Sequence, residues 1–137
     1  MADTQGAERV PEPKFNAAVA RGRVRRLLGS GPFPPPPEHI VADVLLVVTE
    51  LVSNAERHGG GLTSFEATVC DGEILVDVGD RSPRPPHTTS RGSAAPGGFG
   101  WPLVRRLSRR VRVQTAGHGK VIRVALALEA PPGPGRV

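Results

Sequence analysis

The chain has little of several residue types that mark particular classes of protein. One cysteine in 137 residues excludes an internal disulfide, and a thiol nucleophile has no obvious partner. Aromatic residues are 4% of the chain, so no platform for stacking nucleic-acid bases is visible. No apolar run is long enough to cross a bilayer, and the N-terminus has neither a signal core nor a transit helix. We therefore expect a cytoplasmic protein without a membrane span.

Lysine is also scarce, and most of the positive charge comes from arginine. The net charge is +5, while Lys14 and Lys120 are the only lysines. A basic balance permits nucleic acid, nucleotide phosphates or an acidic protein as partner, and it does not choose among them. The 4 histidines are scattered without the spacing of a zinc site. Cys70 lies in an alternating segment, and we interpret it as a buried strand residue.

What is present fits one globular domain. The length and the 38% of hydrophobic residues suffice for a single core, while 15 prolines and 17 glycines indicate long loops or loose ends. We expect a flexible N-terminal segment over residues 1–13, the domain over residues 14–129 and a flexible tail over residues 130–137.

Helical periodicity marks two long segments and one short one. A first helix is expected to follow Asn16, whose side chain can cap it. The segment from about residue 38 to residue 58 is the clearest, because its apolar residues recur at i, i+3, i+4 and i+7 and form one continuous face. A short third helix is expected to open at Gly100.

Alternating residues predict four strands. Two of them flank Asp71-Gly72, a pair typical of hairpin turns, and two follow the third helix, near residues 111–115 and 121–128. Between them, residues 81–98 are rich in proline and glycine and predict a long binding loop or lid. This order of elements predicts an α+β fold, a two-layer α/β sandwich in which helices cover one face of a mixed, mainly antiparallel sheet.

Three groups of residues carry chemistry that suits a nucleotide. Glu50 and Asn54 are four residues apart in TELVSNAERHGGG and share one side of the second helix. Asp80 ends the second strand, where a carboxylate can accept a hydrogen bond from an exocyclic amine. The glycines of GGFG, residues 97–100, open the third helix, where backbone N–H groups can meet phosphate. Each group alone is more often a solvated helix face or a turn, but their order favours a site.

These groups fall in motifs that resemble those of a known superfamily. TELVSNAERH is similar to the N box, VDVGDRSPRPP to a modified G1 box and GGFGWPLVRRL to the G2 box of the histidine-kinase-like ATPase superfamily. Over roughly residues 14–129 the chain most resembles small anti-sigma factor serine kinases and their single-domain actinobacterial relatives. The resemblance implies a Bergerat-type site for ATP and Mg²⁺ between the helices and the sheet.

The resemblance also implies a role for each residue that matches a motif. Asn54 would hold Mg²⁺, and Asp80 would bind the adenine amino group. Gly98 and Gly100 would cradle the phosphates beneath a lid formed by residues 81–97. Magnesium typically keeps several waters and relies on the phosphates for other ligands, which suits a single asparagine oxygen.

For the reaction itself, the resemblance implies that Glu50 is the general base on the serine hydroxyl of a partner protein. His58 is a candidate phosphate contact, and it equally suits the dipole at the helix C-terminus as a cation. The implied partners are a sigma factor and a STAS-like anti-sigma antagonist, and family members often pair as homodimers. The implied activity is that of a protein serine/threonine kinase that regulates transcription, with catalysis by positioning and charge neutralisation.

The sequence departs from the family pattern at several positions. Ser82 and Arg84 replace glycines of the G1 box, and Pro102 follows the G2 box where a small residue is usual. Val121 replaces a threonine, which would remove a hydrogen bond near adenine. A second hypothesis is therefore a catalytically weak or inactive binding module that regulates transcription by sequestering partners. Binding of nucleic acid through the arginines is the weakest hypothesis, because no stacking platform accompanies them.

Overall fold

Helices and strands follow one another in the predicted order within residues 14–86 and 100–129, which are the part of the chain that this computed structural model describes. The helices are α2 (Ala17–Ser30), α3 (Glu38–Arg57) and α4 (Gly100–Leu107), and the strands are β1 (Leu62–Cys70), β2 (Glu73–Asp80), β3 (Arg110–Ala116) and β4 (Gly119–Ala127). The predicted flexible ends, residues 1–13 and 130–137, lie outside the described residues, as does the predicted lid beyond residue 86.

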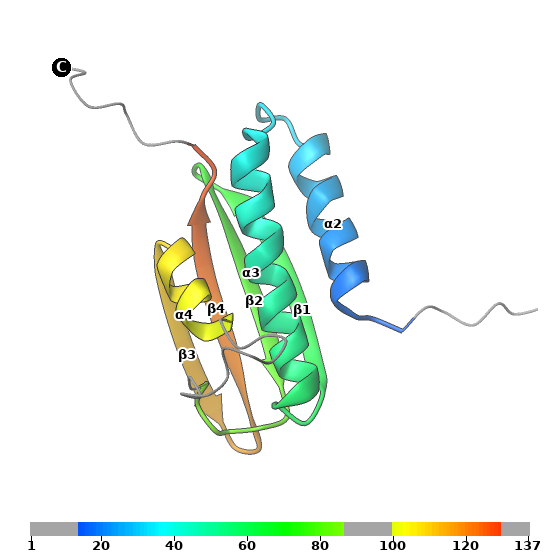
Figure 1. Cartoon of the computed structure of the whole chain (residues 1–137), viewed down its shortest axis with the longest axis vertical. Helices are drawn as coiled ribbons and strands as arrows, with labels where there is room; N and C mark the ends of the chain where they lie inside the picture. Colours follow the sequence, from blue (N-terminus) through cyan, green and yellow to red (C-terminus); the bar gives the residue numbers. More distant parts are fainter. Residues whose placement is uncertain (1–13, 87–99, 130–137) are drawn as a thin grey trace, which may run out of the picture.

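The strands form one sheet with the order β1-β2-β4-β3. Each neighbouring pair among the described strands is antiparallel, and β1 joins β2 through the predicted Asp71-Gly72 turn. All three helices lie on the same face of this sheet (Figure 1). The prediction of a two-layer α/β sandwich is therefore confirmed. None of these helices is long and apolar enough to span a membrane.

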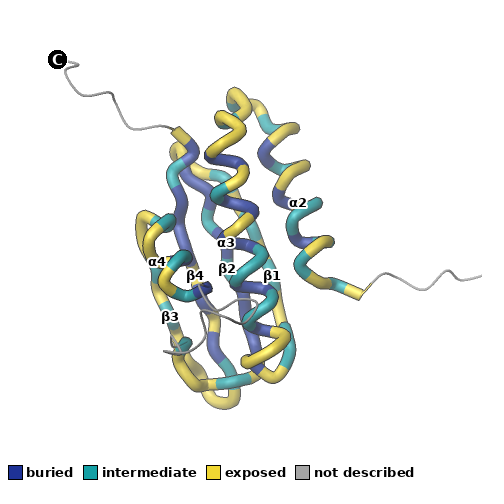
Figure 2. Tube along the Cα trace, viewed as in Figure 1, coloured by how far each residue is buried: buried dark blue, intermediate teal, exposed yellow. Residues whose placement is uncertain are grey.

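The helices form where the sequence pattern places them. Asn16 caps α2 as predicted, because its side-chain oxygen accepts a hydrogen bond of 2.9 Å from the backbone N–H of Val19. The apolar stripe of α3 is buried along its whole length, and the core lies between this stripe and the sheet (Figure 2). The inward residues of the two central strands complete the core: Ile74, Val76, Val78, Ile122, Val124 and Leu126.

Side chains along each strand alternate between the helix-covered face and the opposite, outer face. In β4, Lys120 and Ile122 are buried, whereas Val121 and Arg123 between and beyond them are exposed. The same alternation corrects the expectation for Cys70, which is exposed. Since Val69 packs against the core, the next residue of β1 points outward.

An ion-pair cluster at the far end of the sheet fixes the corner between α4 and β3. The Glu73 carboxylate accepts hydrogen bonds of 2.7 Å from Arg109 Nη1 and 2.8 Å from Arg110 Nη2. The bonds from Arg110, and then those from Arg109, hold the pKa of Glu73 below its ordinary value. The C-terminal end of α4 is thereby anchored to β2, which helps to place its N-terminal residue against α3.

Candidate functional site

The site is built on the polar side of α3. Glu50 and Asn54 are both partly buried and lie one turn apart, as predicted. Glu50 Oε1 is buried and has no hydrogen-bond partner among the described residues. Buried polar atoms in native proteins are nearly always paired, so an exception commonly marks a position where a ligand or reacting group is expected. His58, the third polar residue of this side, is exposed and caps the helix C-terminus.

The first residue of α4 lies directly against these two side chains. A Cβ atom at Gly100 would overlap Glu50 Oε1 and would lie 3.4 Å from Asn54 Nδ2. Only a glycine allows this close approach, so the structure brings Gly100 together with Glu50 and Asn54. Gly98, the other predicted phosphate-binding glycine, lies outside the described residues.

The glycines that follow α3 bring the end of β2 to the helix. Gly60 and Gly61 have positive φ angles of 74° and 118°, a conformation that glycine adopts without strain. The backbone N–H of Arg81 donates to the Gly59 oxygen at 2.8 Å and so ties this turn to the end of β2. A Cβ atom at Gly59 would overlap the carboxyl group of Asp80. The turn therefore packs Asp80 directly beneath the end of α3.

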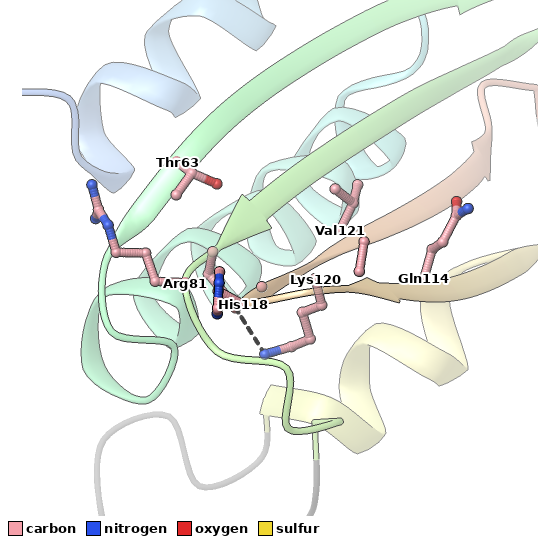
Figure 3. Close-up of a pocket in the computed structure, with 9 residues that line it drawn as sticks. Thr63, Arg81, Gln114, His118, Lys120 and Val121 are labelled. Carbon is pink, nitrogen blue, oxygen red and sulfur yellow. Dashed lines mark hydrogen bonds and ion pairs between the residues drawn. The ribbon is translucent and has the colours of Figure 1, made fainter.

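Asp80 is buried and paired with Lys120. Lys120 Nζ lies 2.9 Å from Oδ2 and 3.1 Å from Oδ1 of Asp80 (Figure 3, dashed line). The Asp80 side chain is 5% exposed and the Lys120 side chain is 6% exposed. Asp80 Oδ1 also accepts the backbone N–H of Ser82 at 2.9 Å. The lysine neutralises the carboxylate that the resemblance assigns to the adenine amino group.

Lys120 is a candidate site residue that the sequence-based prediction did not include. Val121 is exposed and lines one surface hollow together with Asp80 and Lys120, so the loss of a hydrogen bond near adenine at this position stays a prediction. The residue of β4 that reaches Asp80 is Lys120, one position earlier. The sequence did contain this information. Side chains in a strand alternate between the two faces, so Lys120, two residues before the inward Ile122, belongs on the inner face.

A hollow of about 420 Å³ lies over the same end of the sheet, and Asp80 and Lys120 are among the residues that line it. Thr63, Gln114 and Val121 line it and project away from the helices, while Arg81 and His118 stand at its edge (Figure 3). This hollow does not contain Glu50, Asn54 or Gly100, which lie on the helix-covered side.

The geometry on the inner face fits a nucleotide with a bound Mg²⁺. At the start of α4, Gly100 lies against the unpaired Glu50 Oε1 and the Asn54 carboxamide. The Asp80 carboxylate, which can accept a hydrogen bond, lies beyond the end of α3. Glu50 and His58 are separated by roughly 12 Å along the helix axis, at 1.5 Å per residue. Within the described residues no cluster of three metal-binding side chains occurs, so a cation here would take ligands from Asn54, water and phosphates.

The fold is a two-layer sandwich whose candidate site lies between the helices and one end of an antiparallel sheet. The model of the family described as the histidine kinase-like ATPase domain matches residues 14–126. The chain belongs to this family, as its N box and G2 box predict. No curated protein sequence matches the chain.

Solved structures agree with this assignment at the level of the fold. The chain is similar to the RsbU and RsbW domains of Rv1364c from Mycobacterium tuberculosis, with 20% identity and a TM-score of 0.61 over 84% of this chain and 30% of that one. It is also similar to the blue-light activated histidine kinase EL346 from Erythrobacter litoralis, with 19% identity and a TM-score of 0.54 over 81% of this chain and 40% of that one. This chain thus spans less than half of either protein.

Proposed function

We propose that the chain is a regulatory protein that binds Mg-ATP between α3, α4 and the end of the sheet. The observation that carries the proposal is the buried, unpaired Glu50 Oε1 beside Asn54 and a glycine that leaves no room for a side chain. The packing of the described fold gives no reason for a carboxylate oxygen, a carboxamide and a glycine to lie together at this position. Membership of the histidine kinase-like ATPase family supports ATP as the ligand.

Each described residue of the site has a proposed role. Asn54 supplies an oxygen to Mg²⁺, and the backbone at Gly100, together with Gly98, approaches the phosphates. Asp80 accepts the adenine amino group, and His58 contacts a phosphate at the end of α3. When bound, Mg-ATP supplies the transferable phosphoryl group and a cation that offsets its charge.

We further propose that the protein is an anti-sigma factor that phosphorylates a serine of its antagonist. The resemblance of the N box and the G2 box to small anti-sigma factor serine kinases supports this assignment. Glu50 is the proposed general base, because its buried oxygen lies beside the phosphate-binding end of α4 and has no other hydrogen bond among the described residues.

The first test is calorimetric titration with ATP in the presence and absence of Mg²⁺. Asn54→Ala is expected to weaken Mg-ATP binding at least roughly tenfold and to abolish the difference between the two conditions, because it removes the proposed metal ligand. Asn16→Ala is the matched control. It removes the side-chain cap of α2, a helix that contains none of the proposed site residues, and is expected to lower stability by about 1 kcal/mol without changing ATP affinity.

The titration also separates the two functional hypotheses. Absence of binding at millimolar ATP would reject the nucleotide site and favour a binding module that acts by partner exchange. Binding that does not respond to Mg²⁺ or to Asn54→Ala would keep the nucleotide and reject the metal role of Asn54.

Gly100→Ala is expected to weaken ATP binding at least roughly tenfold while changing the free energy of unfolding by less than about 1 kcal/mol. The new methyl group overlaps the tip of the Glu50 side chain, which can rotate away, but it then fills the space beside Asn54. Gly29→Ala in α2 is the matched control. Nothing lies within 4 Å of its added Cβ, so ATP affinity should stay unchanged and stability should rise by about 0.5–1 kcal/mol. Equal ATP affinity of both variants and the wild type would contradict the proposed phosphate-binding role of Gly100.

A further inference from the structure

We infer that Lys120 reads the purine base together with Asp80, an inference that rests on the proposed binding of ATP. Lys120 is buried, although a lysine is seldom buried unless it has a partner, and it is one of two lysines in the chain. It lies at the position where the resemblance places the adenine end of the nucleotide. Its ammonium therefore belongs to the same small polar group as the base-binding carboxylate.

Counting hydrogen bonds leaves one position open on each side chain. The Lys120 ammonium has three N–H donors. A single N–H that points between the two Asp80 oxygens accounts for the distances of 2.9 and 3.1 Å from Lys120 Nζ to these oxygens. A second N–H donates to the Ser82 carbonyl oxygen, with Nζ at 3.2 Å from it. The third has no acceptor among the described residues. Among the described residues, Asp80 Oδ2 accepts only from Lys120, so it can accept a further hydrogen bond.

An acceptor and a donor side by side match one edge of adenine. The exocyclic amino group of adenine donates, and ring nitrogen N1 beside it accepts. Asp80 Oδ2 takes the amino hydrogen while Lys120 Nζ donates to N1. The pair also holds the base-binding end of the site at zero net charge, so the carboxylate does not repel the triphosphate. Lys120 is thus a specificity-determining residue for the base.

The experiment compares ATP with 1-deaza-ATP, in which a C–H group replaces N1 and the amino group is retained. Calorimetric titration of the wild-type protein is expected to give ATP an affinity roughly tenfold or more higher than that of 1-deaza-ATP, because a hydrogen bond from a charged donor is lost. Lys120→Met is expected to bind the two nucleotides equally. Lys14→Met, at the only other lysine and exposed, is expected to discriminate as the wild type does.

The ratio of the two affinities distinguishes base reading from a purely structural role, since general loosening of the site weakens both ligands together. Equal affinities in the wild type, or a ratio that survives in Lys120→Met, would overturn the inference and leave ATP binding standing. GTP binding tighter than ATP would also overturn it. If neither nucleotide binds the wild type, the proposed function fails and the inference fails with it. Should Lys120→Met not fold, the wild-type ratio still decides, and Lys120→Arg, which moves the donors but keeps the charge, is expected to reduce it.

Discussion

Asp80→Asn is expected to destabilise the fold by about 3–5 kcal/mol, the cost of leaving one partner of a buried ion pair without the other. The asparagine keeps the size of the side chain and can still accept the Ser82 N–H, so the change is the loss of charge beside Lys120. Both side chains are at most 6% exposed, which limits the water that could replace the carboxylate. Urea denaturation at neutral pH measures the effect as a fall in the unfolding midpoint.

Two further variants separate charge from position. Asp80→Asn combined with Lys120→Met removes both charges and should recover most of the lost stability, since no unpaired ion stays buried. Asp77→Asn is the surface control. It breaks the pair between Asp77 and Arg123, whose arginine side chain is 56% exposed, and should cost less than about 1 kcal/mol. A cost this small for Asp80→Asn as well would mean that water reaches the Asp80–Lys120 pair in solution.

The helix that carries the site could be predicted from the sequence because its apolar residues repeat with a helical period over its whole length. The predicted segment, about 38–58, ends within one residue of α3 (Glu38–Arg57). The same periodicity places Glu50 and Asn54 on one side, and the structure brings both to Gly100. The periodicity of the sequence was therefore enough to predict which side chains share a face when they lie on the same helix.

The sequence-based prediction failed where the face of a strand had to be assigned. Cys70 was expected to be buried, yet it is exposed, and the buried Lys120 was not recognised as an inward residue. In a strand, an error of one residue reverses the face of the side chain. The inward residues Val69 and Ile122 gave the correct parity in each case, and using them would have identified Lys120.

Contacts between segments far apart in the chain could not be predicted from local pattern. The approach of Gly59 to Asp80 depends on how the turn after α3 packs against the end of β2. The glycines at residues 59–61 predict a turn, but they do not say which side chain will fill the space that a missing Cβ leaves. The buried Asp80–Lys120 pair likewise follows from the register of β2 against β4, in which these two residues lie opposite each other.

Glu50→Gln is expected to lower the transfer of labelled γ-phosphate to the cognate antagonist serine by roughly 10²–10⁴-fold, the usual contribution of a positioned general base. The affinity for Mg-ATP should change by less than about twofold, because the glutamine keeps the shape of the side chain and the base is needed only for the transfer. Single-turnover transfer from ATP measures the first quantity, and calorimetry measures the second. Glu56→Gln, exposed on the same helix, is the matched control and should leave both unchanged.

The unfolding free energy of the same variant gives a second readout that does not depend on the antagonist. A carboxylate oxygen that is buried without a hydrogen-bond partner opposes folding, so Glu50→Gln should leave stability unchanged or raise it, by up to about 1–3 kcal/mol. A structural role for Glu50 predicts the reverse, a loss of stability together with weaker ATP binding. Undiminished transfer in Glu50→Gln would reject the assignment of the base, whereas lost transfer with retained stability and retained ATP affinity is the result expected of a general base and excludes a structural role.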